Sequence, residues 1–513
     1  MSWLYWYLMD TIDLLTLTQL LFEQGLLTNA CYLPPQEGVD LCGADCDSRV
    51  VEPNHLFICK GAAFKPDFLI SALDAGAVAY LAEEDRATEL MSAAPGVPAL
   101  FTDDIRSAMA AASAACWGHP DQKMKVCGIT GTKGKTTVAA FLRSILDGDV
   151  LGSGTAIIGT LETYDGRERI VSKNTTPEAP DLWRYLAHAQ EASLSCVMEV
   201  SSQGLKYQRV EGLSLDVAAF LNIGVDHVSP IEHPTFEDYL ASKLKIFEQA
   251  KCAVVNLGLD PDHLDEIMGA ASTCEKLYTF GMSDAADFWA SDIQATGSGM
   301  SFVAHTPTWT DTVDLALFGS FNVENALAAI AIASLMDVAK DRIISGLTHA
   351  KVVGRMDVCS ADNGHLTTIV DYAHNGMAIH AVLKAVRESH PDRYIIAVFG
   401  ATGGKGAERR FEMPPAAAPF ADRLIFTEDD PGPESAADIC RQMEEATPEG
   451  TSCETILDRS DAIRHAIDLA RTSGRDSVVC VLGKGHEARQ LRSDGAHPMV
   501  ADGEFVRTIL ESL

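Results

Sequence analysis

A glycine-rich, lysine-containing segment is the strongest candidate for chemistry in this sequence. Residues 131–137 read GTKGKTT, directly after the apolar run VCGIT and before a stretch with apolar residues at helical spacing. In a loop between a strand and a helix, backbone N–H groups cradle phosphates, a lysine neutralises them and a hydroxyl binds magnesium. The strict GxxxxGK[ST] pattern fails, because Ile129 stands at its first glycine position. The context still predicts a nucleotide-phosphate loop, made of Gly131, Thr132, Lys133, Gly134, Lys135, Thr136 and Thr137.

Two more polar residues follow apolar runs that we expect to be neighbouring strands. Glu199 ends the run CVMEV, and His227 follows the run VAAFLNIG. Each also has a structural interpretation, a helix N-cap for Glu199 and a packed core histidine for His227. Beside a phosphate loop, a carboxylate is a hard ligand for Mg²⁺ and a histidine is tolerated as a second-site ligand. We therefore predict that both residues belong to a magnesium site.

Lys243 is the most informative lysine, because it lies on the apolar face of a predicted helix. Its neighbours one turn away are Tyr239, Leu240, Ile246 and Phe247, which places the side chain on the buried face. A desolvated lysine has a lowered pKa and a nucleophilic neutral amine. The alternative is a side chain that runs along the apolar surface and brings its amine to solvent.

Two weaker signals come later in the chain. GSFNVEN places Asn322 and Asn325 at the start of an alanine-rich helix, where an amide can read the edge of a purine or can cap the helix. Arg355, in GRMD, lies at the junction between two blocks of the chain, where a guanidinium could reach a phosphate.

The elements that must position these residues form three blocks. Residues 10–120 mix short strand-like runs with alanine-rich helical runs, and two later blocks alternate strands with helices from residue 126 and from about residue 354. Such alternation is typical of parallel sheets. Since ligands of open α/β sheets bind at the carboxyl ends of the strands, the polar motifs predict one composite site between two sheets. We predict an α/β protein with three domains, residues 1–120, 121–350 and 351–513.

The charge balance restricts the partners. The chain has 513 residues, with 40 Lys and Arg against 72 Asp and Glu and a formal charge of −32, which argues against nucleic acid as a partner. No apolar stretch is long enough to span a bilayer, and thirteen scattered cysteines fit the reduced thiols of a cytosolic protein. The aromatic start lacks the basic residues of a secretory signal. We interpret it as a non-native start before Met9, with a hydrophobic anchor as the alternative.

Taken together, the ordered motifs resemble those of the Mur ligases, and in particular of the MurE branch, the UDP-N-acetylmuramoyl-dipeptide:amino-acid ligases of peptidoglycan precursor synthesis. The resemblance covers roughly residues 43–505. Its motifs are GTKGKTT, NTTP, MEVSSQGL, the Asp-His pair at 226 and 227, YLASK, GSFNVEN, GRMD, DYAHN and GKGHE. It implies an N-terminal domain for the UDP end, a central P-loop ATPase with a parallel sheet, and a C-terminal Rossmann-like domain that receives the amino acid.

The resemblance also implies a reaction and a set of site residues. ATP would phosphorylate the D-glutamate carboxylate of the muramoyl dipeptide, and the amine of the incoming amino acid would attack the acyl phosphate. The implied ATP contacts are the residues of the phosphate loop together with Asn322, Arg355 and Asp371. The implied UDP-sugar contacts are Ser48, Asn174, Thr175, Thr176, Ser201 and Arg209. Two Mg²⁺ would be held by Thr136, Glu199, His227 and Lys243, the last as a carbamate formed with CO₂.

The departures from the family pattern point to the amino acid. MurE enzymes that add meso-diaminopimelate resemble one another in a DNPR motif, but the aligned segment here is DDPG, with Asp430 gained and the arginine absent. Lys405 stands for an arginine in the preceding glycine-rich loop. Such a pocket should reject a distal carboxylate and prefer a distal ammonium, so we expect L-lysine, then L-ornithine. The implied amino-acid contacts are Lys405, Asp429, Asp430, Gly483 and Glu487.

Several alternatives stay open at this stage. Gln203, Gly376 and Asp357 replace residues common in the family, which puts details in doubt. The chain could be a diaminopimelate-adding MurE, a MurF-type or folylpolyglutamate-type ligase, a simple P-loop ATPase or kinase, or a non-catalytic homologue. We expect a cytoplasmic monomeric ligase whose partners are ATP, the UDP-muramoyl dipeptide and an amino acid, with no membrane contact.

Overall fold

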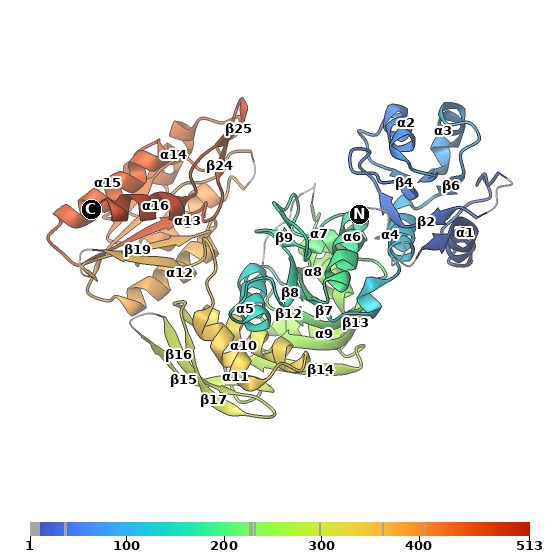
Figure 1. The fold of residues 1–513 in the computed structure, drawn as a ribbon. Coiled ribbons are helices and arrows are strands. Elements are labelled where there is room, and N and C mark those ends of the chain that lie inside the picture. The colour runs from blue at the N-terminus through green and yellow to red at the C-terminus, as the bar shows by residue number, and fades with distance from the viewer. Residues whose placement is uncertain are drawn as a thin grey trace. The chain divides into compact units, whose positions relative to one another are not determined.

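The computed structural model describes residues 11–34, 38–224, 229, 232–296, 299–361, 364–404 and 406–512. Its elements are drawn in Figure 1. Contacts divide the chain into two compact units, residues 1–288 with 328–343, and residues 289–327 with 344–513. Both units are built from helices and largely parallel sheets, so the predicted α/β class is confirmed. The finer division at residues 120 and 350 stays a prediction.

A four-stranded parallel sheet opens the first unit, in the order β3-β4-β5-β6. Its strands are β3 (Gly43–Asp45), β4 (His55–Cys59), β5 (Ala79–Glu83) and β6 (Ala99–Thr102), and a short antiparallel pair, β1 (Ile12–Asp13) and β2 (Asp40–Leu41), precedes it. The helices are α1 (Leu14–Glu23), α2 (Pro66–Ala75), α3 (Ala87–Ala93) and α4 (Ile105–Cys116), with short 3₁₀ turns η2 (Glu84–Arg86) and η3 (Pro120–Gln122). The alanine-rich α4 contacts α1, β3, β5 and α6, since a helix that is apolar all round can be buried on every side.

A larger parallel sheet carries the phosphate loop. Its parallel strands follow the order β8-β11-β7-β12-β13-β14, with β9 and β10 antiparallel beyond β8. The strands are β7 (Val126–Thr130), β8 (Thr155–Ile158), β9 (Thr163–Tyr164), β10 (Arg169–Ile170), β11 (Ser195–Glu199), β12 (Leu215–Phe220), β13 (Ala250–Asn256) and β14 (Lys276–Gly281). Because β11, β7 and β12 are parallel neighbours, their carboxyl ends lie at one edge of the sheet.

The helices between these strands follow the predicted periodicity. They are α5 (Lys135–Asp147), α6 (Ala179–Glu191), α7 (Ser202–Lys206), α8 (Phe236–Leu244), the 3₁₀ turn η4 (Lys245–Gln249) and α9 (Pro261–Ala271). In α5 the apolar stripe that begins at Val138 and Phe141 is buried, and α5 packs on β7, β8 and β11. The helices α10 (Ser320–Leu335) and α11 (Lys340–His349) each contain a boundary between the two units.

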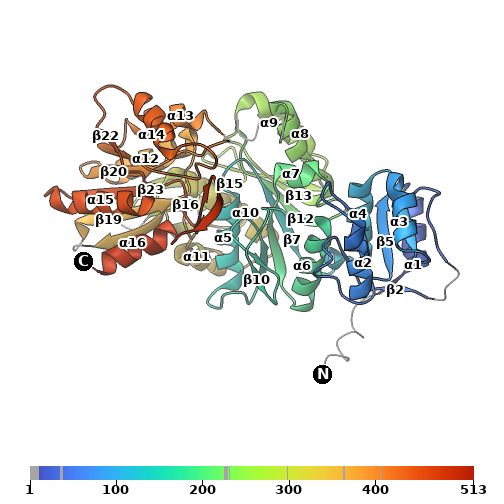
Figure 2. The same cartoon turned by 90° about the horizontal axis from the view of Figure 1, so that it is seen from above.

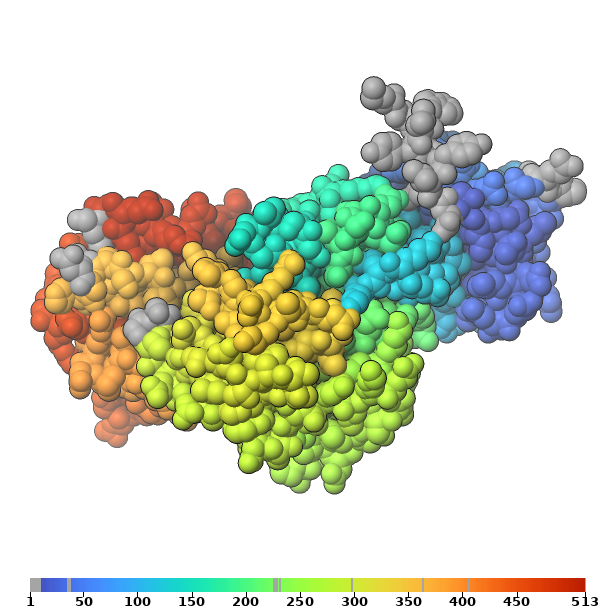
Figure 3. Space-filling view, turned by 60° about the horizontal axis from the view of Figure 1, so that its bottom comes forward, coloured from blue at the N-terminus to red at the C-terminus, as the bar shows by residue number. Residues whose placement is uncertain are grey.

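From Trp289 onward, the second unit contains an antiparallel ribbon of β15 (Phe288–Ala295), β16 (Met300–His305) and β17 (Thr310–Leu315). Burial alternates along β16, as expected for a strand with one covered face. Residues of this ribbon form part of the yellow-green surface in Figure 3.

The C-terminal sheet of the second unit has the order β18-β19-β23-β20-β21-β22, in which only β18 is antiparallel to its neighbour. The strands are β18 (Asp357–Ala361), β19 (Leu366–Asp371), β20 (Tyr394–Phe399), β21 (Arg423–Phe426), β22 (Cys453–Thr455) and β23 (Ser477–Leu482), followed by a hairpin of β24 (Arg489–Arg492) and β25 (Gly495–Pro498). The helices are α12 (Gly376–Ser389), α13 (Arg409–Ala417), α14 (Ala436–Glu445), α15 (Arg459–Thr472) and α16 (Asp502–Glu511). Figure 2 shows β20 and β23 between α12–α14 and the pair α15–α16, which is the doubly covered arrangement of a Rossmann-like sheet.

Two further properties concern membrane-spanning helices and cysteines. In the part of the chain that the structure describes, no helix is both long and apolar enough to cross a membrane. All thirteen cysteines are free thiols.

Candidate active site

The GTKGKTT segment forms a tight loop between β7 and α5. Gly134 precedes the helix in the left-handed region, with φ 88°, a conformation that glycine adopts without strain. Asn222, at the end of the neighbouring strand, fixes the loop: its Oδ1 accepts from Lys133 N at 2.8 Å and its Nδ2 donates to Lys133 O at 3.0 Å. Lys135 Nζ donates to Gly131 O at 2.7 Å. The loop therefore presents a helix N-terminus and a lysine, as phosphate binding requires.

A buried hydroxyl–carboxylate pair lies beside this loop. Thr136 Oγ1 donates to Glu199 Oε2 at 2.9 Å, and Glu199 is only 2% exposed. Thr160 also binds this carboxylate, through its backbone N–H to Oε1 at 2.9 Å and its hydroxyl to Oε2 at 3.0 Å. Glu199 is therefore not the N-cap of α7, since that cap is Ser201. Two hard oxygen groups of the kind that Mg²⁺ prefers meet next to the phosphate loop.

Lys243 is as buried as its helical position predicts. Its side chain is 1% exposed, its Nζ donates to Gly131 O at 3.0 Å, and the amine lies 4.7 Å from the centre of the Tyr239 ring. Tyr239 in turn contacts Thr132 Oγ1 at 3.1 Å. The alternative of a side chain that brings its amine to solvent is therefore wrong. Instead, the Lys243 amine donates to the same carbonyl oxygen as the Lys135 amine.

Three of the residues implied for the UDP-sugar lie together at the carboxyl end of β11. Thr176 Oγ1 lies 3.1 Å from Ser201 Oγ and donates to Glu199 O at 3.0 Å, while Arg209 Nη1 donates to Thr176 O at 3.1 Å. Arg209 Nε also pairs with Glu178 at 2.8 Å. The cluster thus places two hydroxyl groups, one of them buried, and an ion-paired arginine next to Glu199.

In the second unit, three carboxylates predicted to bind the amino acid surround Lys484, a residue that was not predicted to belong to the site. Lys484 Nζ lies 2.6 Å from Asp430 Oδ1, 3.0 Å from Glu487 Oε2 and 3.8 Å from Asp429 Oδ1. Burial, together with the negative charges of Asp430 and Glu487, raises the pKa of Asp429 to about 6. The side chain of Lys484 is 0% exposed, whereas those of Asp430 and Glu487 are 24% exposed. The cluster thus has an open side formed by Asp430 and Glu487 and a buried side that holds Lys484 and Asp429.

The residues implied for the adenine and ribose are largely engaged by the protein itself. The Asn322 amide donates to Phe318 O at 2.8 Å and accepts from the Asn325 side chain at 3.1 Å. Because α10 already begins at Ser320 and an N-cap side chain accepts from a backbone N–H, these contacts are not those of a helix cap. Asp371 accepts from two backbone N–H groups, each at 2.8 Å, and burial raises its pKa although Arg355 opposes the shift. The Arg355 guanidinium lies 4.7 Å from the centre of the Tyr372 ring, and its buried Nε has no hydrogen-bond partner in the part of the chain described.

The chain matches two family models, the Mur ligase middle domain over residues 129–333 and the Mur ligase glutamate ligase domain over residues 354–485. A Streptococcus thermophilus protein named UDP-N-acetylmuramoyl-L-alanyl-D-glutamate–L-lysine ligase is 35% identical to this chain over 493 residues. The match covers 95% of this chain and 96% of the Streptococcus protein. The chain belongs to the Mur ligase family. A UDP-N-acetylmuramyl-tripeptide synthetase of Bifidobacterium longum is 38% identical to this Mur ligase, over 90% of this chain and 91% of the relative.

A solved structure agrees with this assignment. A UDP-N-acetylmuramoyl-L-alanyl-D-glutamate–2,6-diaminopimelate ligase is 27% identical, with a TM-score of 0.64 over 92% of this chain and 95% of that one. Members of the family are ATP-dependent ligases, so this protein is an enzyme of that class.

The remaining predicted site residues of this Mur ligase have few contacts with the residues described above or lie outside the described part of the chain. Ser48 is partly buried and Asn174 is exposed, while Thr175 Oγ1 contacts Thr160 Oγ1 at 3.1 Å. His227 and Lys405 lie outside the described residues. In the described part of the chain, no group of three or more His, Cys, Asp or Glu side chains has a metal-binding arrangement.

Three residues of the site, Thr160, Asn222 and Lys484, were not predicted from the sequence. Only Lys484 carried a signal that could have found it, because it stands inside the GKGHE motif between two glycines. The other two are single polar residues in loops, and only the pairing of strands brings them to the site.

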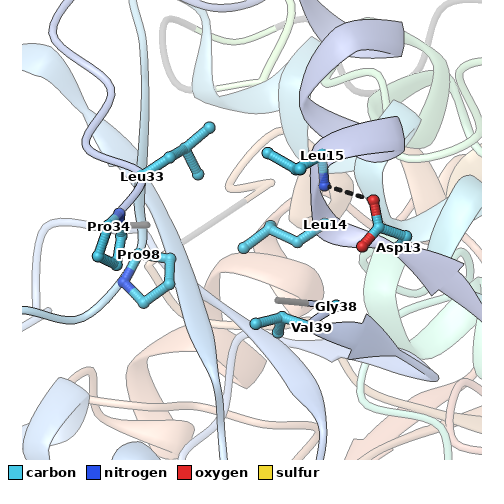
Figure 4. Close-up of a pocket in the computed structure, with 8 residues that line it drawn as sticks. All are labelled: Asp13, Leu14, Leu15, Leu33, Pro34, Gly38, Val39 and Pro98. Carbon is cyan, nitrogen blue, oxygen red and sulfur yellow. Dashed lines mark hydrogen bonds between the residues drawn. The ribbon is translucent and has the colours of Figure 1, made fainter. Parts of the chain in front are cut away.

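A pocket in the N-terminal part of the first unit does not belong to this site. It is lined by residues of the α1 start and of the loops around Pro34 and Pro98, and Figure 4 shows Asp13 bonded to the backbone of Leu15 rather than turned to a ligand. None of the predicted site residues lines it.

Proposed function

We propose that this Mur ligase adds L-lysine to UDP-N-acetylmuramoyl-L-alanyl-D-glutamate, with L-ornithine as the next best amino acid. The observation that carries the choice of amino acid is the acidic cluster. Asp429, Asp430 and Glu487 against Lys484 give a formal charge of −3 + 1 = −2 when all are ionised. A cluster of this sign favours an ammonium group and opposes a second carboxylate. The L-lysine ligase named among the relatives supports the same choice.

The first half of the proposed reaction activates the D-glutamate carboxylate. The phosphate loop and Lys135 bind the β- and γ-phosphates of ATP, and the α5 N-terminus faces them. The substrate carboxylate attacks the γ-phosphorus, the bond to the bridging oxygen breaks, and ADP leaves with that electron pair. Thr176, Ser201 and Arg209 bind the UDP-sugar substrate, together with Ser48, Asn174 and Thr175.

The residues present fit the magnesium and the carbamate that the family resemblance implies. The Thr136 hydroxyl and the Glu199 carboxylate lie 2.9 Å apart and are both oxygen ligands, so they would hold one Mg²⁺, with His227 assigned to the second. Magnesium would neutralise charge that develops on the transferred phosphoryl group. Lys243 is buried beside the loop, and because CO₂ adds only to a neutral amine, its carbamate would supply an anionic oxygen ligand in place of a cation.

The second half forms the amide. Asp430 and Glu487, each partly exposed, bind ammonium groups of the incoming amino acid, and Asp429 adds to the negative field. We assign Gly483 and Lys405 to amino-acid binding as well, as the family resemblance implies. The α-amine attacks in its neutral form and bonds to the acyl carbon, phosphate leaves with the electron pair of the C–O bond, and the nitrogen releases one proton to water. Asn322, Arg355 and Asp371 contribute to binding of the adenine and ribose. We also propose a cytoplasmic location, where free thiols persist.

The direct test is phosphate release from ATP with the UDP-muramoyl dipeptide and a panel of L-lysine, L-ornithine, meso-diaminopimelate and L-alanine. We expect release that depends on both the dipeptide and L-lysine, with a slower rate for L-ornithine. Mass spectrometry of the product should show one added lysyl residue. Release stimulated by diaminopimelate and not by lysine would refute the assignment.

A further inference from the structure

Lys484 occupies an unusual place for a lysine, because its ammonium lies on the closed side of the acidic cluster. Its side chain is fully buried, while Asp430 and Glu487, which it contacts, keep about a quarter of their side chains exposed. A ligand can therefore reach these carboxylates from the open side while Lys484 holds them from behind. Burial lowers the pKa of Lys484, but the three surrounding carboxylates offset this and the net shift is upward, so the ammonium stays charged.

The backbone on both sides is built to bring Lys484 inward. Gly483 has φ 112° and Gly485 has φ 55°, values that residues with a Cβ rarely adopt. A Cβ at Gly483 would lie 2.5 Å from Asp429 Oδ2, and one at Gly485 would lie 2.7 Å from Gly354 O. Gly483 therefore allows the chain to approach the Asp429 carboxylate closely, and Gly485 allows it to pass close to the backbone of Gly354.

The hydrogen bonds of the cluster leave a defined open face. Glu487 accepts from Lys484 through Oε2 at 3.0 Å and from the Tyr372 hydroxyl through Oε1 at 3.1 Å. Asp430 accepts from Lys484 and from Leu491 N through the same oxygen, Oδ1, at 2.6 and 2.7 Å. These contacts fix the plane of each carboxylate and leave Asp430 Oδ2 without a hydrogen bond to any described residue.

We propose that Lys484 is a positioning residue that sets amino-acid specificity: its buried ammonium orients Asp430 and Glu487 and holds the open face at a charge that accepts a substrate ammonium. This inference rests on the proposed function, because it names how that site selects its amino acid. Without Lys484 the three carboxylates lose the cation that they share, and their mutual repulsion turns them apart, although Glu487 and Asp430 keep the bonds from Tyr372 and Leu491 N. The site then loses the geometry with which its open face receives an ammonium group.

The experiment compares Lys484→Ala and Lys484→Gln with the unchanged protein, measuring KM separately for L-lysine, ATP and the UDP-muramoyl dipeptide. A charge-assisted hydrogen bond contributes enough that we expect KM for lysine to rise about 10- to 100-fold, with the other two KM values within about twofold. Arg489→Ala is the control, since it removes an exposed cation five residues away and should leave all three values unchanged.

Chemical rescue separates an electrostatic role from a packing role. Propylammonium matches the part of the side chain that Lys484→Ala removes, and 1-propanol has a similar shape without the charge. We expect propylammonium, and not propanol, to recover part of the lost lysine affinity. The inference is wrong if KM for lysine is unchanged in both variants, if all three KM values rise together, or if propanol rescues equally well. Failure of the unchanged protein to use lysine would instead refute the proposed function.

Discussion

Asp430→Asn tests the acidic cluster with the smallest change in shape. The amide oxygen of asparagine can still accept from Leu491 N and from Lys484, the two contacts that Asp430 Oδ1 makes at 2.7 and 2.6 Å. The formal charge of the cluster changes from −2 to −1, because one carboxylate becomes neutral. The change therefore removes charge while keeping the local hydrogen bonds.

The expected loss follows from the exposure of the site. A hydrogen bond to a charged group contributes about 1.5–3 kcal/mol, and the 24% exposure of the Asp430 side chain lets water screen part of it. We expect a loss of about 1.5–2.5 kcal/mol for L-lysine, which corresponds to a fall of about 10- to 70-fold in kcat/KM. The melting temperature should change little, since the backbone contact of the side chain is kept.

The assay is phosphate release at varied L-lysine with ATP and the UDP-muramoyl dipeptide saturating. Glu428→Gln is the matched control, because it removes one carboxylate two positions away that pairs with Arg492 at 2.5 Å rather than with the cluster. We expect the control to keep its kcat/KM for lysine within about twofold. If Asp430→Asn also stays within twofold, the cluster does not select the ammonium and the reasoning fails.

Three further predictions address the loop, the pH dependence and the fold. Lys243→Ala should abolish turnover, and a short carboxylic acid should restore part of it; normal turnover would contradict the role of this buried amine. Because the pKa of Asp429 is raised to about 6, protonation below that pH should raise KM for lysine, and Asp429→Asn should flatten the profile between pH 7.5 and 5.5. The pKa of Asp429 is thus higher in the folded protein than its ordinary value of 3.8. The contribution of this group to the free energy of unfolding is therefore fully present below about pH 4 and is lost as the pH rises through 6. In the unchanged protein, Arg459 donates two hydrogen bonds to the Asp502 carboxylate, at 2.9 and 2.7 Å, and Asp502→Ala removes this buried counter-ion. We expect urea unfolding to show that the free energy of unfolding falls by about 3–5 kcal/mol. An unchanged urea midpoint would contradict this prediction.

The helix faces and the loop between β7 and α5 could be predicted from the sequence because they depend on local spacing. Lys243 is an example: its neighbours three and four residues away are apolar, and the side chain is 1% exposed. The phosphate loop was predictable for the same reason, since a strand, a glycine-rich turn and a helix are consecutive in the chain. Asn322 was harder, because the same position suits a ligand contact or a helix start, and its amide bonds to Phe318 and Asn325.

The partners of each side chain were decided only when distant segments came together. Thr160 and Thr136 bind Glu199 because β8 and β7 both pair with β11, and no local pattern encodes that pairing. The sequence by itself determined that an acidic motif and a phosphate loop exist, through residue type and spacing. Only the tertiary structure decided that the carboxylates of the DDPG and GKGHE motifs share one buried lysine, because charges more than fifty residues apart in the chain interact once β21 and β23 lie in one sheet.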